Sequence, residues 1–519
     1  LFMIKTRYAP SPTGFLHVGG LRTALYCYLI AKQNGGKFLL RVEDTDQKRS
    51  VEGAVENMIN SLHWAGLNID EGVDLDKEGK IVQTGDKGPY IQSQRLEIYK
   101  KHADELLERG EAYHCFCTAE RLAEMKDYQQ KNKLPTGYDG HCRDLDVEEV
   151  KKKLVAGEPS VIRMKMPKEG ETTFTDLIRG EVTFKNELID DQVLIKTDGF
   201  PTYHLAVVID DHFMEITHVI RGEEWLSSTP KHLQLYKYFG WTPPLFAHLS
   251  LLLNADKSKL SKRQGDVAVE DYIKKGYLPE AMINFVAFLG WNPGTEQELF
   301  TLEELVKEFK IEKINKSGAV FNLDKLNWYN QQYTKKWSNE DLAGWAGVHL
   351  MELLFSKENI PVPTMPKELT DENMEAMGKP FLMIRDKYAP LLIKAVALER
   401  ERISTMSELV EAIKFIIKLP DYDGSLLVWK KSSAEEVKKI LPELAEFLNT
   451  NFVQEWNKEN LEAEVKKWIG EKGYQNGSVL WPLRVALSGQ DKSPGPFEIA
   501  EVLGKEETIS RINLAIGKI

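Results

Sequence analysis

The sequence has few cysteines for its length. Its 519 residues include only Cys27, Cys115, Cys117 and Cys142. A secreted scaffold held together by disulfides needs a denser set, so the composition argues against that class and favours a reducing cytosol. Cys27 lies in a helix-like pattern and is interpreted as a small core residue, whereas the other three cysteines form a cluster.

Long hydrophobic runs and targeting segments are also missing. No uncharged run reaches about 18 residues, so we expect no membrane-spanning helix. The start, Leu1-Phe2-Met3, leads directly into a strand-like run, without the apolar stretch and small-residue cleavage site of a signal peptide. These absences predict a cytoplasmic protein with no membrane partner.

The balance of charge is acidic, with a net charge of −11. Taken alone, that total argues weakly against nucleic-acid binding. The charges are unevenly distributed, however, because Lys and Arg outnumber Asp and Glu over residues 1–50 and the order reverses over residues 51–90. A basic face for RNA is therefore compatible with the total. At about 150 residues per domain, the length predicts three or four domains.

The first 42 residues have the pattern of a nucleotide-binding α/β unit. Residues 3–8 predict a strand, and Pro10 to Gly14 predict a stiff loop, because proline fixes φ and glycine permits a sharp bend. Apolar residues between Leu21 and Leu29 recur at helical spacing, Gly35-Gly36 ends that helix, and residues 38–42 predict a buried strand. This strand–loop–helix–strand unit is typical of a doubly wound parallel sheet.

The middle of the chain has a different pattern. A helix is predicted over residues 97–114, and the stretch 115–188 is interpreted as an insertion between two halves of the nucleotide fold. Its short strand candidates are residues 160–166 and 181–184.

Beyond the insertion, strand-like runs return at residues 192–196 and 204–209. From Pro279 onward the spacing of apolar residues is mostly helical. Breaks between helices are expected at three prolines, Pro361, Pro420 and Pro482.

Two motifs indicate chemistry on phosphate groups. His17-Val18-Gly19-Gly20 stands where the first loop enters its helix, and a helix N-terminus offers free N–H groups to an anion. Lys259-Leu260-Ser261-Lys262-Arg263 places three cations within five positions, which suits a clamp on triphosphate. Taken separately, each has a plainer interpretation, namely a glycine-rich turn with a surface histidine and a solvated basic loop.

Together the two motifs resemble the HIGH and KMSKS signatures of class I aminoacyl-tRNA synthetases. Further motifs are similar to glutamyl-tRNA synthetases of bacterial type, and they extend over nearly the whole chain: RYAPSPTGFLHVGG from Arg7, RVEDTD (41–46), FPTYHLAVVIDDH (200–212), HVIRGEEW (218–225), NFVAFLGWNPG (284–294) and WPLRVALSG (481–489).

The resemblance implies an α/β fold, with a doubly wound, Rossmann-type catalytic domain, an inserted acceptor-binding domain and a helical C-terminal half. It divides the chain into the first catalytic half (1–114), the insertion that binds the tRNA acceptor end (115–188), the second catalytic half (189–255), a stem-contact region with the KLSKR loop (256–335) and a helical anticodon-binding domain (336–519).

The resemblance also implies roles for single residues. The glutamate site would comprise Arg7, Ala9, Ser11, Glu43, Tyr203 and Arg221. The ATP site would comprise Pro10, Ser11, Thr13, Gly14, His17, Gly20, Glu224, Trp225, Leu260, Ser261, Lys262 and Arg263. The groups acting on the phosphates would be His17, Gly19, Gly20, Lys259 and Lys262. Val207 departs from the family, which commonly has asparagine there, and this leaves one contact to glutamate undecided.

The activity implied is glutamate–tRNA ligation with ATP and Mg²⁺. Glutamate would be activated as glutamyl-adenylate and then transferred to the terminal ribose of tRNA-Glu, and the sequence does not decide whether tRNA-Gln is also charged. A monomer is the family expectation.

The cysteine cluster resembles the zinc site of some glutamyl-tRNA synthetases. Cys115, Cys117 and Cys142 would supply thiolates to a tetrahedral Zn²⁺. The family's last ligand is histidine, but Asp144 stands at that position, so the fourth ligand is open among Tyr138, Asp144 and His141. A metal-free insertion is the alternative.

Other functions fit less well. A short paralogue that glutamylates a tRNA base lacks the C-terminal half, and a small nucleotidyltransferase with a HIGH motif is much shorter. Glutaminyl-tRNA synthetase has β-barrel anticodon domains, whereas this C-terminal half has a helical pattern. A catalytically inactive tRNA-binding protein would not need the intact motifs at Arg7, His17, Glu43 and Lys259.

Overall fold

A four-residue strand, a proline-rich loop and a long helix open the fold, as the sequence predicts. The computed structural model describes residues 3–260, 268–360, 379–452 and 454–519. Strand β1 (Lys5–Tyr8) leads into α1 (Val18–Gln33), and β2 (Lys37–Leu40) follows. Helix α1 is buried on most of its surface, because β1, β2 and β10 (His218–Gly222) pack against it together with α9 (Pro279–Ala287) and α10 (Leu302–Glu308).

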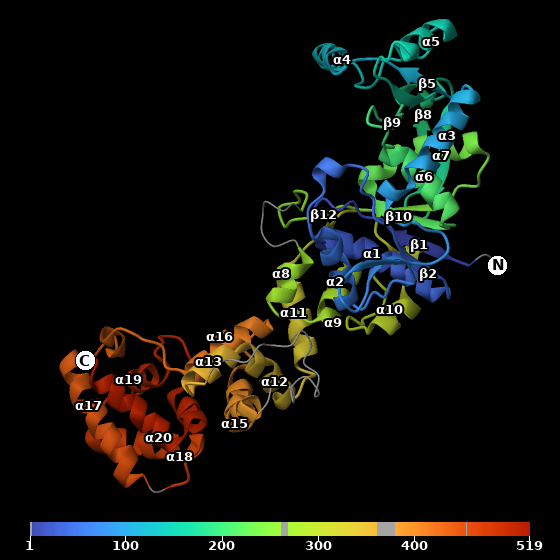
Figure 1. Ribbon diagram of the computed structural model, residues 1–519. Coiled ribbons are helices and arrows are strands. Elements are labelled where there is room, and N and C mark those ends of the chain that lie inside the picture. Colours follow the sequence, from blue (N-terminus) through green and yellow to red (C-terminus); the bar gives the residue numbers. More distant parts are fainter. Residues whose placement is uncertain (1–2, 261–267, 361–378, 453) are drawn as a thin grey trace. The chain divides into compact units, whose positions relative to one another are not determined.

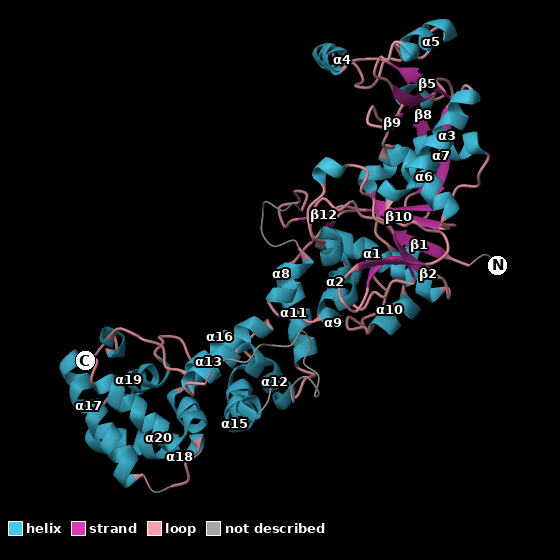
Figure 2. Cartoon of the chain, in the orientation of Figure 1, coloured by secondary structure: helices cyan, strands magenta, loops and turns pink. Residues whose placement is uncertain are grey.

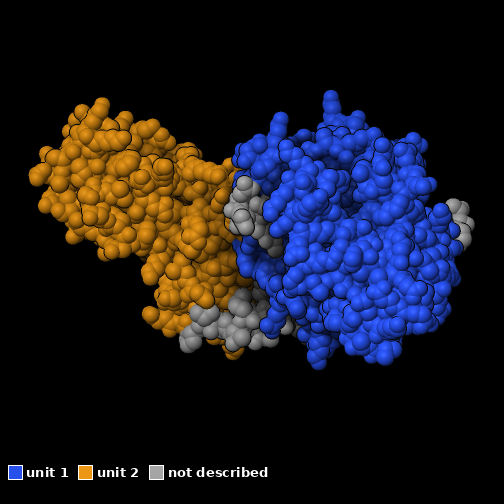
Figure 3. All heavy atoms as spheres, turned by 90° about the horizontal axis from the view of Figure 1, so that it is seen from above, with its two compact units in different colours: residues 1–274, 278–329 blue, residues 275–277, 330–519 orange. Residues whose placement is uncertain are grey.

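The chain forms two compact units, coloured separately in Figure 3. Unit 1 comprises residues 1–274 and 278–329, and unit 2 comprises residues 275–277 and 330–519. Figure 2 shows that the strands lie in unit 1, and the described part of unit 2 is helical.

The main sheet of unit 1 is open and has its strands in the order β4-β3-β2-β1-β10-β11-β7-β8. The pairs from β3 through to β7 are parallel, and an antiparallel hairpin closes each edge, β3–β4 on one side and β7–β8 on the other. The remaining bounds are β3 (Glu71–Leu75), β4 (Ile81–Thr84), β7 (Glu171–Asp176), β8 (Gly180–Lys185) and β11 (Leu245–Leu249).

The order of the strands reverses between β1 and β10, since β2 and β3 continue to one side of β1 and β11 continues on the far side of β10. This is the switch point of a doubly wound sheet, where ligands bind beyond the carboxyl ends of the strands. The predicted fold class is confirmed.

Two further small sheets complete unit 1. The first has the order β5-β6-β9, with β5 (Ala112–Cys115), β6 (Val161–Met164) and β9 (Val193–Ile195), and the second pairs β12 (Leu252–Leu253) with β13 (Ala319–Val320). Figure 1 shows α4 (Ala119–Lys131) and α5 (Val147–Val155) beside β5. The other helices of this part are α2 (Ala54–Trp64), α3 (Leu96–Glu108), α6 (Tyr203–Phe213), α7 (Thr229–Phe239) and α8 (Val269–Lys274). Helix α11 (Leu323–Thr334) begins in unit 1 and ends in unit 2.

The segment 115–188 contributes strands to the main sheet and to the three-stranded sheet. Its β6 lies in the three-stranded sheet, whereas its β7 and β8 extend the main sheet beside β11. The domain boundaries given above stay predictions, and the structure adds that the hairpin β7–β8 is continuous with the catalytic sheet.

Unit 2 is built on one hydrophobic core that runs through its helices. These are α12 (Asn339–His349), α13 (Met351–Lys357), α15 (Lys379–Glu399), α16 (Met406–Ile417), α17 (Ala434–Glu446), α18 (Lys458–Lys472), α19 (Asn476–Ser488) and α20 (Pro496–Ile516). No helix in the described ranges is long and apolar enough to cross a membrane.

Three local expectations are wrong. The run 204–209 is not a strand but lies in α6, which begins after Pro201-Thr202 and buries residues 205–209. A short, continuous apolar run fits a buried helix as well as a buried strand, so its periodicity cannot separate them. The predicted helix 97–114 ends at Glu108, and β5 begins at Ala112.

The third error is at Pro482, which lies inside α19 and does not end it. Pro420 does fall between helices, as expected, and Pro361 lies outside the described residues.

Candidate active site

A cavity of about 560 Å³ lies beyond the carboxyl ends of β1 and β10. Arg7 to Pro10 enter it from the end of β1, and Ile220 to Gly222 enter it from the end of β10. The cavity is therefore at the switch point where a doubly wound sheet binds its ligand. Every described residue of the predicted glutamate, ATP and phosphate sites lines it: Arg7, Ala9, Pro10, Ser11, Thr13, Gly14, His17, Gly19, Gly20, Glu43, Tyr203, Arg221, Glu224, Trp225, Lys259 and Leu260.

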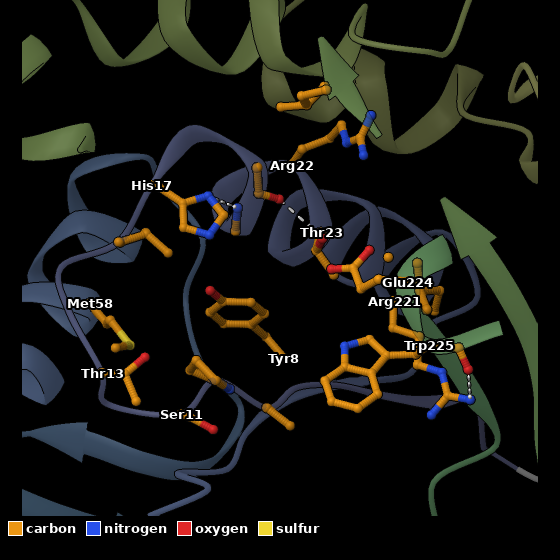
Figure 4. A pocket seen from close by; sticks show the side chains of 18 of the residues that line it. Tyr8, Ser11, Thr13, His17, Arg22, Thr23, Met58, Arg221, Glu224 and Trp225 are labelled. Carbon is orange, nitrogen blue, oxygen red and sulfur yellow. Dashed lines mark hydrogen bonds between the residues drawn. The ribbon is translucent and has the colours of Figure 1, made fainter. Parts of the chain in front are cut away.

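The N-terminus of α1 faces this cavity, with His17 as its cap (Figure 4). The Gly20 amide donates to Nδ1 of His17 at 3.1 Å. Because Nδ1 accepts, a neutral His17 ring carries its proton on Nε2. The first turn thus combines a ring N–H with the amides of a helix N-terminus, an arrangement suited to phosphate oxygens.

Gly20 packs directly against Tyr8, whose ring stands in the middle of the cavity in Figure 4. A Cβ at residue 20 would lie 2.5 Å from the Tyr8 hydroxyl and 2.9 Å from Leu16 Cδ1. Only glycine allows this approach, so the HVGG motif also fixes the place of Tyr8.

Lys259 and Leu260 line the cavity at the beginning of the second motif. The Leu260 amide donates to the carbonyl of Leu252 in β12 at 2.9 Å, which fixes the start of the motif beside the site. Ser261, Lys262 and Arg263 lie outside the described residues.

Arg7 and Glu43 belong to a buried ionic network. Asp211 accepts from Nε of Arg7 at 3.1 Å and from Arg41 at 2.8 Å, and Arg41 also donates to Glu43 Oε1 at 2.9 Å. Burial raises the pKa of Glu43, and Arg41 opposes the shift. In this network each cation is paired with a carboxylate, so Arg7 is held in place and its charge is already compensated.

Arg221 is buried in a different environment. Its Nε donates to His248 Nε2 at 3.0 Å, and one Nη donates to the Tyr203 hydroxyl at 2.9 Å and to His232 Nδ1 at 3.2 Å. The other Nη donates to Thr229 Oγ1 at 3.0 Å and to the carbonyl of Trp225 at 3.3 Å.

All these acceptors are neutral, and in the described part of the chain no carboxylate lies within 4.0 Å of the Arg221 guanidinium. A buried cation without a carboxylate partner is costly. The arrangement therefore favours an anionic ligand.

Tyr203 and Trp225 form one wall of the cavity, with ring centroids 4.2 Å apart. The Tyr203 oxygen accepts from Arg221, so its own proton can point toward a ligand. Glu224 folds back over Gly222, where a Cβ would lie 2.2 Å from its Oε2. Val207 does not line the cavity and is buried in a hydrophobic cluster with its neighbours in α6.

Several lining residues were not predicted, among them Tyr8, Arg22, Thr23, Met58 and Ser250. Arg22 is buried and donates to the carbonyls of Leu289 and Ser250, which connects α1 to the segment before the second motif. The sequence could have indicated a special role for Arg22, because it is a charged residue within the apolar pattern of α1. Ser250 and Met58 are brought to the cavity only by the tertiary fold.

The three clustered cysteines meet at the end of β5. The Sγ atoms of Cys115, Cys117 and Cys142 lie within 4.8 Å of one another. The Tyr138 hydroxyl is 3.3 Å from Cys115 Sγ and 3.5 Å from Cys117 Sγ, and it accepts from the Cys142 amide at 2.9 Å. Burial raises the pKa of the Tyr138 hydroxyl, and the neighbouring thiols raise it further.

Three thiols this close together fit the thiolate ligands of a tetrahedral zinc site. The Tyr138 oxygen lies beside two of them as a candidate fourth donor. Asp144 and His141 are exposed and are not part of the group of close ligand atoms. Of the three candidates for the fourth ligand, Tyr138 is thus the one that the fold brings to the cysteines.

Comparisons with known proteins identify the family of the chain. Residues 3–328 match the family model of "tRNA synthetases class I (E and Q), catalytic domain", and residues 373–516 match an "Anticodon binding domain". The chain is 47% identical to a "Glutamate--tRNA ligase" of Clostridioides difficile over 513 residues, which are 98% of each chain. It is also 47% identical to the protein of that name from Chloroherpeton thalassium over 526 residues, covering 99% of this chain and 98% of the relative.

Solved structures are similar over the same length. A "glutamate tRNA ligase from Elizabethkingia meningosepticum CCUG26117 in complex with its amino acid" matches with a TM-score of 0.78 and 37% identity, over 99% of each chain. A "Glutamate-tRNA Synthetase from Elizabethkingia anophelis" matches with a TM-score of 0.77 and 36% identity, over 99% of this chain and 100% of that one.

The packing of Gly20 gives a testable prediction. Gly20→Ala adds a methyl group that must displace the Tyr8 ring within the cavity. Overpacking of this kind costs about 1–3 kcal/mol of folding free energy. Because the displaced Tyr8 ring lies in the cavity, we also expect the variant to bind ATP about tenfold more weakly by calorimetry, which corresponds to about 1.4 kcal/mol.

The matched control is Gly470→Ala in α18, where a Cβ meets no atom within 4 Å. It should leave ATP affinity unchanged and slightly raise the melting temperature, because alanine is a better helix former than glycine. Equal ATP affinity of Gly20→Ala and the wild type would contradict the role assigned to this close contact.

Proposed function

This chain belongs to the class I tRNA synthetases (E and Q), and from that premise we propose that it is a glutamate–tRNA ligase. The observation that supports glutamate most directly is the buried Arg221 guanidinium, which lines the cavity and is surrounded by neutral acceptors. The amino acid complex of the Elizabethkingia enzyme and the identity to curated ligases over nearly the full length are consistent with it.

Glutamate carries two carboxylates and one ammonium group. In the proposed complex the charge of Arg221 attracts a carboxylate that accepts from the Tyr203 hydroxyl, because the five N–H groups of Arg221 already donate to the protein. Arg7 adds a second guanidinium at the end of β1. Glu43 receives the ammonium group, with Ala9 and Ser11 lining the same side of the cavity. Because Arg41 already holds one oxygen of Glu43, the carboxylate has a fixed orientation before the substrate binds.

ATP would take the other side of the cavity. The loop Pro10, Ser11, Thr13 and Gly14 with Glu224, Trp225 and Leu260 would surround the nucleotide. His17 Nε2–H and the Gly19 amide would donate to the phosphate oxygens, and the Gly20 amide would keep the His17 ring in place by donating to its Nδ1. Lys259 and Lys262 would neutralise the leaving pyrophosphate together with Ser261 and Arg263. Mg²⁺ bound with ATP would compensate phosphate charge.

The reaction has two steps. An α-carboxylate oxygen of glutamate attacks the α-phosphorus of ATP, a new P–O bond forms, and the bond to pyrophosphate breaks. A hydroxyl of the terminal tRNA ribose then attacks the carbonyl carbon of the adenylate, loses its proton, and AMP leaves. No protein side chain forms a covalent bond, so the site acts by positioning the reactants and by stabilising negative charge on phosphate.

The partner is tRNA-Glu. The insertion would hold the acceptor end, residues 256–335 would contact the stem, and the helices of unit 2 would bind the anticodon, in keeping with the match of residues 373–516 to an anticodon-binding domain. We propose a cytoplasmic monomer. Whether tRNA-Gln is also a substrate depends on the anticodon contacts.

We also propose that Zn²⁺ binds to Cys115, Cys117 and Cys142, with Tyr138 as the fourth ligand. The ion would stabilise the end of the insertion by linking β5 to the segment 138–142. Zinc at this site would take no part in the reaction, because Cys115 ends β5 of the three-stranded sheet and none of the four proposed ligands lines the cavity.

The test of the function is attachment of labelled glutamate to purified tRNA. With ATP present, the protein should charge tRNA-Glu and release AMP and pyrophosphate, and omission of ATP should abolish the product. Charging of tRNA-Gln in the same assay distinguishes a non-discriminating from a discriminating enzyme. If neither tRNA accepts glutamate although a reference synthetase charges both preparations, the proposal is wrong.

The zinc proposal is tested by metal content. The purified wild type should contain one zinc ion per chain by mass spectrometry. Tyr138→Phe removes the ligand oxygen and should lose zinc to a chelator at least about tenfold faster, since loss of one ligand weakens a site strongly.

Two controls accompany Tyr138→Phe. Tyr128→Phe changes an exposed tyrosine of α4 and should retain the wild-type rate, as should Asp144→Asn. If Asp144→Asn loses zinc while Tyr138→Phe keeps it, the fourth ligand is Asp144, and absence of zinc from all preparations would refute the site.

A further inference from the structure

The hydrogen bonds around Arg221 determine the protonation of two histidines. A guanidinium has only donors, so each ring nitrogen that it contacts must be an acceptor without a proton. His248 therefore accepts at Nε2 and carries its proton on Nδ1, whereas His232 accepts at Nδ1 and carries its proton on Nε2. The two imidazoles are held in opposite tautomers by the same side chain.

His248 is held from its other side by Asp176. Its Nδ1–H donates to Asp176 Oδ2 at 2.6 Å, and both side chains are fully buried. Asp176 is itself fixed by the amides of Ile178 and Arg179, which donate to Oδ1 at 3.0 and 2.9 Å. A carboxylate that accepts from Nδ1 keeps Nε2 available as an acceptor, which is the role of the aspartate in a Ser-His-Asp triad.

His232 is held from its other side by His204. The two rings are joined from His232 Nε2 to His204 Nδ1 at 3.1 Å. Burial lowers the pKa of His232 well below its ordinary value, and burial together with Lys231 and Arg221 lowers the pKa of His204 to about 3. Both rings therefore stay neutral at physiological pH, and neither repels the guanidinium.

We propose that His248 and His232 are positioning residues that fix the Arg221 guanidinium for the substrate carboxylate without neutralising it. The inference rests on the proposed function and deepens it by naming the groups that sustain selection of an acidic amino acid.

The contrast with Arg7 and Arg41 supports this inference. Those two cations are oriented by Asp211 and Glu43, and their charge is thereby compensated. A carboxylate in the place of His248 would orient Arg221 equally well, but it would also neutralise the charge that attracts the substrate. Neutral imidazoles in a single tautomer orient the guanidinium without compensating its charge. The carboxylate of Asp176 contacts His248 on the side away from Arg221, so the imidazole ring separates it from the guanidinium.

The opposite tautomers allow a crossed test. In length, a glutamine amide reaches the position of a histidine Nε2, and an asparagine amide reaches that of Nδ1. His248→Gln therefore keeps an acceptor for Arg221, whereas His248→Asn keeps only the contact to Asp176. At residue 232 the order is reversed, because His232→Asn keeps the acceptor for Arg221 and His232→Gln keeps only the contact to His204.

The measurement is the KM for glutamate and for ATP in tRNA charging, with the melting temperature of each variant. We expect the KM for glutamate to stay within about threefold for His248→Gln and His232→Asn, and to rise about tenfold or more for His248→Asn and His232→Gln. A lost hydrogen bond to a charged group accounts for this size. The KM for ATP should not follow this ranking, because ATP does not contact Arg221 in the proposed complex.

A purely structural role predicts another pattern. If the same amide is preferred at both positions, if all four variants match the wild type, or if the KM values for glutamate and ATP rise together with a falling melting temperature, the inference is overturned. Asp176→Asn is the test to use if the histidine variants do not fold. An asparagine amide that donates to Nδ1 reverses the tautomer of His248, so that Nε2 no longer accepts from Arg221. The KM for glutamate should then rise, and the KM for ATP should not. An unchanged KM in folded Asp176→Asn would overturn the inference.

Failure of the proposed function gives a separate result. Wild-type protein that charges no tRNA with glutamate refutes the ligase activity itself. A wild type that charges tRNA normally, with four variants that lack the crossed ranking, refutes only the positioning role.

Discussion

The buried positive charge of Arg221 is the constraint around which the catalytic unit is organised. Desolvating a guanidinium costs several kcal/mol unless its donors and its charge are both satisfied. The donors are satisfied by residues from four separate elements, α6, η4 (Glu223–Ser228), α7 and β11. The charge is not, since no carboxylate approaches it within the described chain. This imbalance favours an anion at the end of β10, and the arrangement is already present without a ligand.

The charges around the ends of β1 and β2 are arranged differently. Around β1 and β2 the cations Arg7 and Arg41 are matched by Asp211 and Glu43, and Arg95 and Tyr99 are matched by Asp210. This network fixes α6 and α3 against the sheet and sets the orientation of Glu43. One side of the cavity is therefore electrically balanced and rigid, and the other carries the excess charge. A substrate with carboxylates at both ends and an ammonium group matches this distribution.

The sequence predicted the parts of this site that lie in local motifs. The loop from Pro10 to Gly14 and the HVGG turn could be placed because proline, glycine and a helix N-terminus have strong local preferences. Arg221, Tyr203 and Glu43 were identified only through resemblance to a family, since isolated charged or aromatic residues carry no structural signal. The partners of Arg221 could not be found in this way. His232, His248 and Asp176 come from α7, β11 and β7, and only the order of strands in the sheet brings them together.

The wrong prediction for residues 204–209 and the choice left open for the fourth zinc ligand have related causes. The run 204–209 is apolar without a clear period, so the sequence does not distinguish a strand from a helix. Packing within the buried cluster around α6 favours the helix. Tyr138 could not be preferred over Asp144 from spacing alone, because the turn between residues 138 and 142 directs the phenol back toward the thiols. In both cases a tertiary contact chose between alternatives that the local sequence left equal.

The most direct test of the account is the ratio of catalytic efficiency for glutamate to that for glutamine, measured in tRNA charging for the wild type and for Arg221→Gln. A neutral carboxamide cannot compensate the buried charge, so the wild type should prefer glutamate by a factor on the order of 10⁴, the range found where a buried polar group is left unpaired. The variant lacks the charge, and its preference should fall by at least about a hundredfold. If Arg221→Gln keeps the wild-type ratio while losing efficiency for both amino acids alike, the charge of Arg221 does not select the substrate, and the central claim is contradicted.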